Sequence, residues 1–201
     1  MTKTIATVLV VVATFAASLA AQDTTIKISE DVPALEFVGQ FNNSGPSSQQ
    51  FGYISNINGF SPVFNGTPQN ESTANFTFVT NATTTAVFVN GPFKIIDRTG
   101  TTTVYLNNGP SDFSNPGTFS QGTPIQVSTY SQQVVLNTVT GAFSTVHLNS
   151  ITATKSFVMN GVSYQLGQVG KSFRTTYSGQ VNSVAGTTPS GWFGGHAVGI
   201  K

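Results

Sequence analysis

The chain has 201 residues, of which 38% are hydrophobic and only 7% are charged, and its formal net charge is +1 at pH 7. This length predicts one domain with a buried core, and a content of 16 Phe favours a folded chain over a disordered one. The composition excludes nucleic acid as a partner, because phosphate binding needs clustered Lys and Arg and the eight basic residues here are scattered. The absence of Cys excludes disulfides, thiolate metal sites and a Cys nucleophile.

Residues 1–21 have the three parts of a secretory signal peptide. One positive charge precedes an apolar run from Ile5 to Ala17 that is too short to span a bilayer comfortably, and small residues suited to cleavage follow. We therefore expect a secreted or extracellular protein (periplasmic or at the cell surface in a bacterium) with no stable membrane span after cleavage. The antiparallel domain is expected in residues 22–182, and residues 183–201 form a Gly/Ser-rich tail that is either a closing strand or a loose end.

In the N-terminal half, alternating apolar and polar residues predict short strands separated by turn residues. A polar segment at Asn42–Gln50, marked by Gly and Pro, predicts a loop. Asn81–Thr83 and Arg98–Gly100 predict turns that join paired strands. In chain order, the expected strands are Thr25–Ile28, Leu35–Val38, Phe51–Ile57, Thr73–Thr80, Thr84–Val89, Phe93–Asp97 and Thr101–Leu106.

The clearest pattern lies between Gln133 and Val181. At its centre, Asn160-Gly161 separates two alternating runs, Lys155–Met159 and Val162–Leu166. Asn-Gly accepts the positive φ angles of a type I′ turn, so this segment predicts a β-hairpin. We expect the stretch Gln133–Val181 as a whole to be the centre of the scaffold. The other strands expected in this half are Ile125–Thr129, Gln133–Thr140, Phe143–Leu148 and Phe173–Val181.

No segment after the signal peptide has helical periodicity, and no fixed-period repeat is present. The sequence therefore predicts an all-β fold, a single antiparallel β-barrel or β-sandwich of about 8–10 short strands. A closed sheet suits this composition, because few charges are available to protect strand edges from pairing with other chains.

The sequence contains no catalytic motif, and a non-catalytic protein is favoured. His147 shares a strand face with Thr145, opposite Val146 and Leu148, so it points to solvent or to a barrel lumen if the second face is the core. No spacing singles out a pair among the seven acids, and Asp97-Arg98 is interpreted as a turn-stabilising pair. No metal site and no cofactor are expected.

Ligand binding has two sets of candidate residues. The Phe-rich strands would line a barrel lumen, with His147, Tyr177 and Glu36 as its polar groups. Trp192, which lies next to Phe193 and between glycines, is a candidate platform for a carbohydrate ring; the alternative is an aromatic pair that covers a sheet edge.

Three functional classes stay open. The first is a secreted, non-catalytic β-domain with a structural, surface or ligand-binding role. The second is a small β-barrel, similar in fold to lipocalin-like or allene oxide cyclase-like barrels, that binds or cyclises an apolar small molecule; no motif carries a residue-by-residue match to either. The third is a small outer-membrane β-barrel, although the chain ends Gly-Ile-Lys rather than in an aromatic strand. The oligomeric state is open as well.

Overall fold

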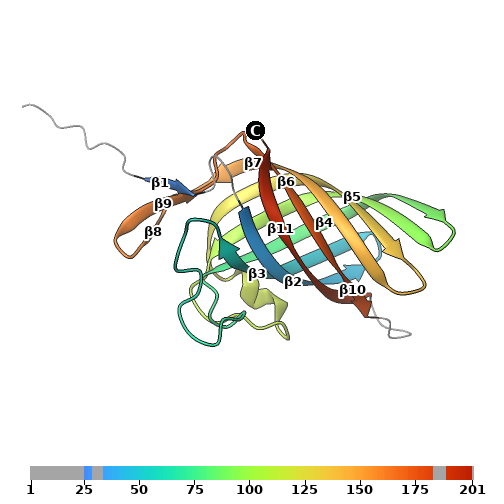
Figure 1. The fold of residues 1–201 in the computed structure, drawn as a ribbon, viewed down its shortest axis with the longest axis horizontal. Helices are drawn as coiled ribbons and strands as arrows, with labels where there is room; N and C mark the ends of the chain where they lie inside the picture. The colour runs from blue at the N-terminus through green and yellow to red at the C-terminus, as the bar shows by residue number, and fades with distance from the viewer. Residues whose placement is uncertain (1–24, 29–33, 183–188, 201) are drawn as a thin grey trace, which may run out of the picture.

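The computed structural model describes residues 25–28, 34–182 and 189–200, so the predicted signal peptide lies outside the described residues. The chain is all-β and forms a closed antiparallel barrel with the strand order β10-β11-β2-β3-β4-β5-β6-β7, which confirms the predicted fold class and selects the barrel over the sandwich (Figure 1). No helix among these residues has the length and hydropathy needed to cross a membrane. The barrel strands are β2 (Ala34–Ser44), β3 (Ser47–Ile57), β4 (Phe76–Asn90), β5 (Phe93–Leu106), β6 (Thr123–Asn137), β7 (Ala142–Thr154), β10 (Ser172–Asn182) and β11 (Ser190–Ile200).

Alternation along each strand separates the lumen from the outer wall, since successive side chains in a strand point to opposite faces. In β7, Phe143, Thr145 and His147 are buried, whereas Val146 and Leu148 are exposed. The apolar residues Val146 and Leu148 therefore do not mark the core face of this strand. His147 points into the lumen.

Several segments that were expected to be turns lie inside long strands. Asn81–Thr83 is part of the 15-residue β4, and Arg98–Gly100 is part of the 14-residue β5, so both predicted turns are wrong. Gly100 pairs with Ala82, and a Cβ atom at Gly100 would lie 2.2 Å from the backbone oxygen of Asn81. Glycine is required here by the close approach of two strands, as is common for glycine inside a sheet.

The predicted loop Asn42–Gln50 is also wrong over most of its length. Strands β2 and β3 continue through it and pair as far as Ser44 and Ser47. The reversal is confined to Gly45 and Pro46, and Gly45 has the positive φ of 58° that a tight turn uses.

The predicted Asn160-Gly161 hairpin is confirmed. Strands β8 (Phe157–Met159) and β9 (Val162–Leu166) are joined by Asn160 and Gly161, whose φ angles are 52° and 78°. The stretch Gln133–Val181, which we expected at the centre of the scaffold, is divided: the end of β6, all of β7 and most of β10 lie in the barrel, whereas the hairpin does not. The hairpin forms a separate three-stranded sheet with β1 (Ile26–Ile28) that projects from one end of the barrel (Figure 1), because arms of three and five residues are too short to join barrel strands of 11 or more.

Strand β11 closes the barrel by pairing with β10 on one side and with β2 on the other. β11 lies in the segment 183–201, for which the sequence allowed either a closing strand or a loose end. A Cβ atom at Gly195 would lie 2.4 Å from Cβ of Tyr177, so this glycine leaves the space in which Tyr177 enters the lumen. The closing strand therefore helps to position Tyr177, a buried polar side chain of the lumen.

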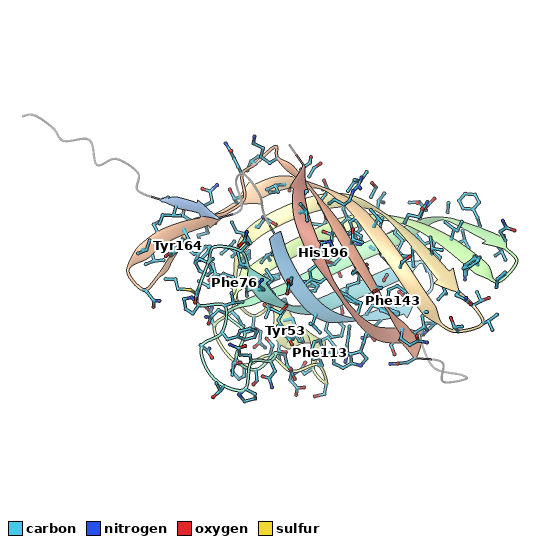
Figure 2. All side chains as sticks on the ribbon, in the orientation of Figure 1. Tyr53, Phe76, Phe113, Phe143, Tyr164 and His196 are labelled. Atoms are coloured by element: carbon cyan, nitrogen blue, oxygen red, sulfur yellow. The ribbon has the colours of Figure 1, made fainter. Side chains whose placement is uncertain are left out.

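A short 3-10 helix, η1 (Pro116–Ser120), covers part of the outer wall. Phe119 is fully buried there against Phe51 and Val79, which belong to β3 and β4 but face outward. Phe113 and Tyr53 lie in the same outer cluster (Figure 2). The chain therefore has two apolar regions, one inside the barrel and one beneath η1.

Candidate functional site

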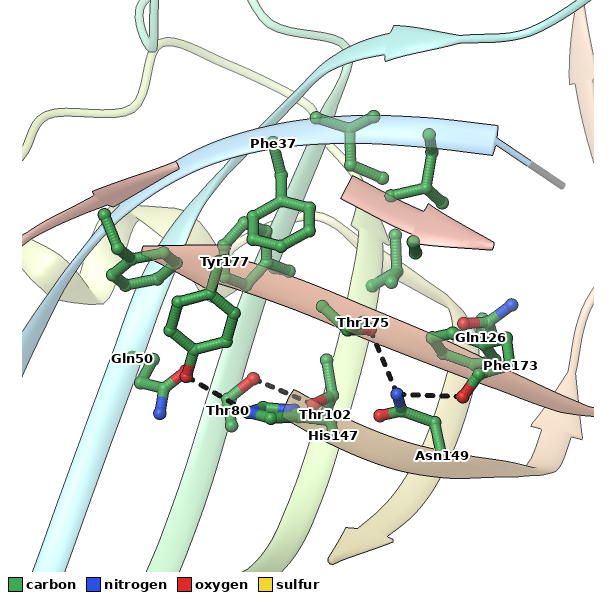
Figure 3. Close-up of a pocket in the computed structure, with 16 residues that line it drawn as sticks. Phe37, Gln50, Thr80, Thr102, Gln126, His147, Asn149, Phe173, Thr175 and Tyr177 are labelled. Carbon is green, nitrogen blue, oxygen red and sulfur yellow. Dashed lines mark hydrogen bonds between the residues drawn. The ribbon is translucent and has the colours of Figure 1, made fainter. Parts of the chain in front are cut away.

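A layer of hydrogen-bonded polar side chains crosses the middle of the lumen. The Tyr177 hydroxyl donates to Oε1 of Gln50 at 2.9 Å and accepts from Nε2 of Gln132 at 2.8 Å. Nε2 of His147 lies 3.0 Å from the same hydroxyl (Figure 3). Strands β3, β6, β7 and β10 each contribute one of these residues, so the layer exists only when the barrel is closed.

The hydrogen bonds determine the protonation of His147. A tyrosine hydroxyl has one hydrogen to donate, and Tyr177 gives it to Gln50, so the hydroxyl accepts from the two remaining partners. His147 therefore donates from Nε2. Burial, and secondarily the charge of Arg98, lowers the pKa of His147 to about 3, so the ring is neutral at ordinary pH. One face of the His147 ring is covered by Tyr130, which stacks on it with a centroid separation of 4.4 Å and an interplanar angle of 8°.

Arg98 is a buried cation on the lumen side of β5, with 9% of its surface exposed. Nε donates to Oγ1 of Thr84 at 3.3 Å, and Nη2 donates to Oδ1 of Asn43 at 3.4 Å. Burial lowers the pKa of Arg98. The interpretation of Asp97-Arg98 as a turn-stabilising pair is wrong, because the two residues are in a strand and face opposite sides; Asp97 is bonded to Gln133 on the outer wall.

Some buried polar atoms in the lumen have no hydrogen-bond partner among the described residues. They include the hydroxyl of Tyr130, Oε1 of Gln132 and the hydroxyl of Ser128. Burial raises the pKa of Tyr130 and of Tyr177, so both hydroxyls stay protonated at neutral pH. Because buried polar groups are nearly always paired, an unpaired atom beside a cavity indicates a place where a ligand or water supplies the partner. Of these three residues, Gln132 lines one of the two cavities described next.

Two cavities flank the polar layer. The first, about 60 Å³, lies toward the end of the barrel that carries β8 and β9, and the second, about 40 Å³, lies toward the opposite end. Gln50, Tyr177 and Phe193 line both cavities and so form the partition between them. The first cavity is also lined by Leu35, Ile54, Asn149, Phe173, Thr175 and Ala197. The second is also lined by Phe41, Asn43, Ile96, Arg98, Leu136 and Val181.

The structure brings together two of the four predicted site residues, His147 and Tyr177. Glu36 is exposed on the outer wall, opposite His196 of β11, and does not reach the lumen. Trp192 is also on the outer wall, 46% exposed, with its ring centroid 4.7 Å from that of Phe113. A role for Trp192 in carbohydrate binding stays a prediction.

Sequence reasoning missed Gln50, Gln132 and Arg98. Gln50 was placed in a loop and Arg98 in a turn, so neither was considered as part of a strand face. A signal for Arg98 was present, because a continuous strand puts it on the same face as Ile96 and Val104.

The site therefore consists of neutral hydrogen-bonding groups, one buried cation and two small cavities with largely apolar walls. A scan with protein-family models, a search of curated proteins and a search of solved structures found no match to this chain.

Proposed function

We propose that the protein binds a small molecule inside its barrel, at the polar layer around Tyr177, and that it does so outside the cell. The observation that carries the proposal is Oε1 of Gln132, a buried acceptor that has no hydrogen-bond partner among the described residues and belongs to a side chain that lines the second cavity. Such an atom costs about 1–3 kcal/mol, so a barrel selected only for stability would be filled with apolar side chains. The signal-like segment at residues 1–21 supports the extracellular location.

Binding accounts for the polar layer better than acid–base catalysis does. A general base works best when its pKa is near the operating pH, whereas the pKa of His147 is lowered to about 3. The raised pKa values of Tyr130 and Tyr177 keep both as hydrogen-bond donors. In the part of the chain that the structure describes, no carboxylate is bonded to His147.

The outer wall supports a ligand-binding barrel over a membrane barrel. Barrels of outer membranes carry an apolar band on the outward face and polar residues inside. Here the outward positions of β5 and β6 include Thr99, Thr101, Thr129 and Ser131, all exposed, whereas the lumen is rich in Phe. The wall also exposes Val146, Leu148 and Val198, but these polar positions interrupt an apolar band around the barrel.

The sizes of the cavities limit what the closed lumen holds. A volume of about 60 Å³ is well below the roughly 300–1,000 Å³ of sites for drug-sized ligands. The lumen therefore accepts a fragment-sized molecule, or one end of a larger molecule whose other end extends out of the barrel.

The test is a fragment screen by ligand-observed NMR, repeated on variants that fill the lumen. Ala197→Phe fills the first cavity and Val134→Phe fills the second, because both residues are buried on the lumen side. Val198→Phe is the matched control for Ala197→Phe, and Val135→Phe is the matched control for Val134→Phe. Each control introduces a Phe ring at the following residue, whose side chain is on the outer wall. We expect fragments that bind the wild-type protein to lose binding to one filled variant and to keep it with both controls.

Fragments that bind all five proteins equally would place binding outside the lumen. A diverse library with no binder at all would also refute the proposal. Near-ultraviolet circular dichroism on each variant shows that the barrel is folded.

A further inference from the structure

The positive charge of Arg98 has only neutral partners. Its hydrogen bonds to Thr84 and Asn43 are long and use two of the five guanidinium N–H groups. A buried charge is normally paired with an opposite charge or with several strong hydrogen bonds. Arg98 has neither within the described ranges.

The acids that the structure describes lie elsewhere. Glu36 and Asp97 are on the outer wall. Asp112 accepts a hydrogen bond from Ser114 in the segment before η1. The charge of Glu71 interacts with Tyr53, which is on the outer wall. None of the four acids of residues 34–182 therefore supplies a counter-charge to Arg98.

The cavity beside Arg98 matches the size of a carboxylate. Its volume is about 40 Å³, and a water-sized group needs roughly 10–15 Å³ by this measure, so about three such groups fit. A carboxylate has three heavy atoms, and its two oxygens match the planar fork of the guanidinium. The unpaired N–H groups of Arg98 are thus available to a group of this shape.

An apolar face leads outward from Arg98. Ile96 shares the lumen face of β5 with Arg98, and Val134 and Leu136 of β6 line the same cavity. Directly opposite residues of an antiparallel pair share a face, so Val87, opposite Ile96, and Val89, opposite Lys94, continue this face to the hairpin tip.

The tip has the exposure expected of an unfilled binding surface. Val87 is 47% exposed and Val89 is 73% exposed. The β4–β5 hairpin that carries them extends beyond the end of the barrel opposite β8 and β9 (Figure 1). Lys94 lies on the same face near the tip, where its positive charge favours the approach of an anion.

We propose that Arg98 binds the carboxylate of an amphipathic ligand whose apolar chain lies along Ile96, Leu136 and Val87 toward the hairpin tip. This inference rests on the proposed function, that the lumen takes a small molecule. Arg98 and Lys94 are four positions apart in β5, which is about 13 Å at ~3.3 Å per residue, a length that suits a chain of about ten carbons.

The experiment compares three ten-carbon probes, decanoate, decanol and decylammonium, by isothermal titration calorimetry. The wild-type protein should bind decanoate at least about tenfold more tightly than decanol, because charge-assisted hydrogen bonds are roughly twice as strong as neutral ones. Decylammonium should bind most weakly. Equal affinity for decanoate and decanol would overturn the inference.

Variants at the two arginines assign the preference to a residue. Arg98→Met should abolish the preference for decanoate and raise the melting temperature of the ligand-free protein, because an unpaired buried charge is replaced by an apolar chain. Arg174→Met is the matched control, since Arg174 is exposed on the outer wall, and it should change neither. If Arg98→Met does not fold, Arg98→Lys decides: a lone ammonium cannot form the paired bonds, so unchanged decanoate affinity would overturn the inference.

Failure of the inference is distinguishable from failure of the proposed function. If decanoate and decanol bind equally and both are blocked by Val134→Phe, the lumen binds ligands but Arg98 does not select a carboxylate. If none of the three probes binds and the fragment screen is empty, the proposed function fails as well.

Discussion

The polar layer should make a large contribution to stability through a single oxygen atom, the hydroxyl of Tyr177. Tyr177→Phe removes this hydroxyl and leaves Gln50, Gln132 and His147 each without a hydrogen-bond partner. A buried polar group left unpaired costs about 1–3 kcal/mol. Because the glutamine side chains can rotate toward each other, the lower end of that range applies, and the total is about 3 kcal/mol. The packing of the ring is unaffected, since the substitution removes only the oxygen.

Tyr130→Phe is the matched control. Tyr130 is as deeply buried as Tyr177, at 5% exposure each, but its hydroxyl has no partner among the described residues. Removing an unpaired buried hydroxyl should leave the stability unchanged or raise it by up to about 1 kcal/mol. The stacking of the ring on His147 is preserved.

Equilibrium unfolding in urea measures both variants. The midpoint should fall for Tyr177→Phe and stay or rise for Tyr130→Phe, with the same dependence on denaturant, because the exposed surface on unfolding is unchanged. A loss below about 1 kcal/mol for Tyr177→Phe, or an equal loss for the two variants, would refute the reasoning that the hydrogen bonds of the layer stabilise the barrel.

Three further predictions follow from the same structure. Gly100→Ala should destabilise the barrel by about 3 kcal/mol or more in urea unfolding, because the added Cβ meets backbone of β4 at 2.2 Å, whereas Gly109→Ala, with nothing within 4 Å, should change little. The folded-state pKa of His147, about 3, lies below the unfolded value of about 6.5, so the unfolded chain takes up the extra proton; stability should therefore fall by up to about 1.4 kcal/mol per unit as the pH drops from about 6.5 toward 3. His147→Gln should remove this component and His196→Gln should keep it; identical pH profiles for the wild-type protein and His147→Gln would contradict it. Gly161→Ala, at a φ of 78°, should destabilise the β8–β9 hairpin by about 1 kcal/mol, and hydrogen exchange should speed up there but not in the barrel.

The error at Arg98 shows where sequence reasoning failed and why. Arg98–Gly100 has the composition of a turn, and turn propensity is a local property of the chain. Whether such a segment turns depends on its neighbours, and here β4 and β6 pair with β5 along its whole length. The hydrogen bonds of two neighbouring strands outweigh a local preference of a few tenths of a kcal/mol to about 1 kcal/mol. Because Arg98 was assigned to a turn, the one buried cation of the described lumen was not recognised as a lumen residue.

The all-β class and the Asn160-Gly161 hairpin follow from the sequence alone, because alternation and the φ requirement of a two-residue turn are local properties. The lumen orientation of His147 was reduced to two alternatives by the same alternation. Tertiary structure decided the rest. Closure of the sheet determines which strand face is inside, and the register across four strands brings Gln50, Gln132 and His147 to one hydroxyl of Tyr177. Those residues are separated by up to 127 positions in the chain, and no local pattern encodes a contact between residues so far apart.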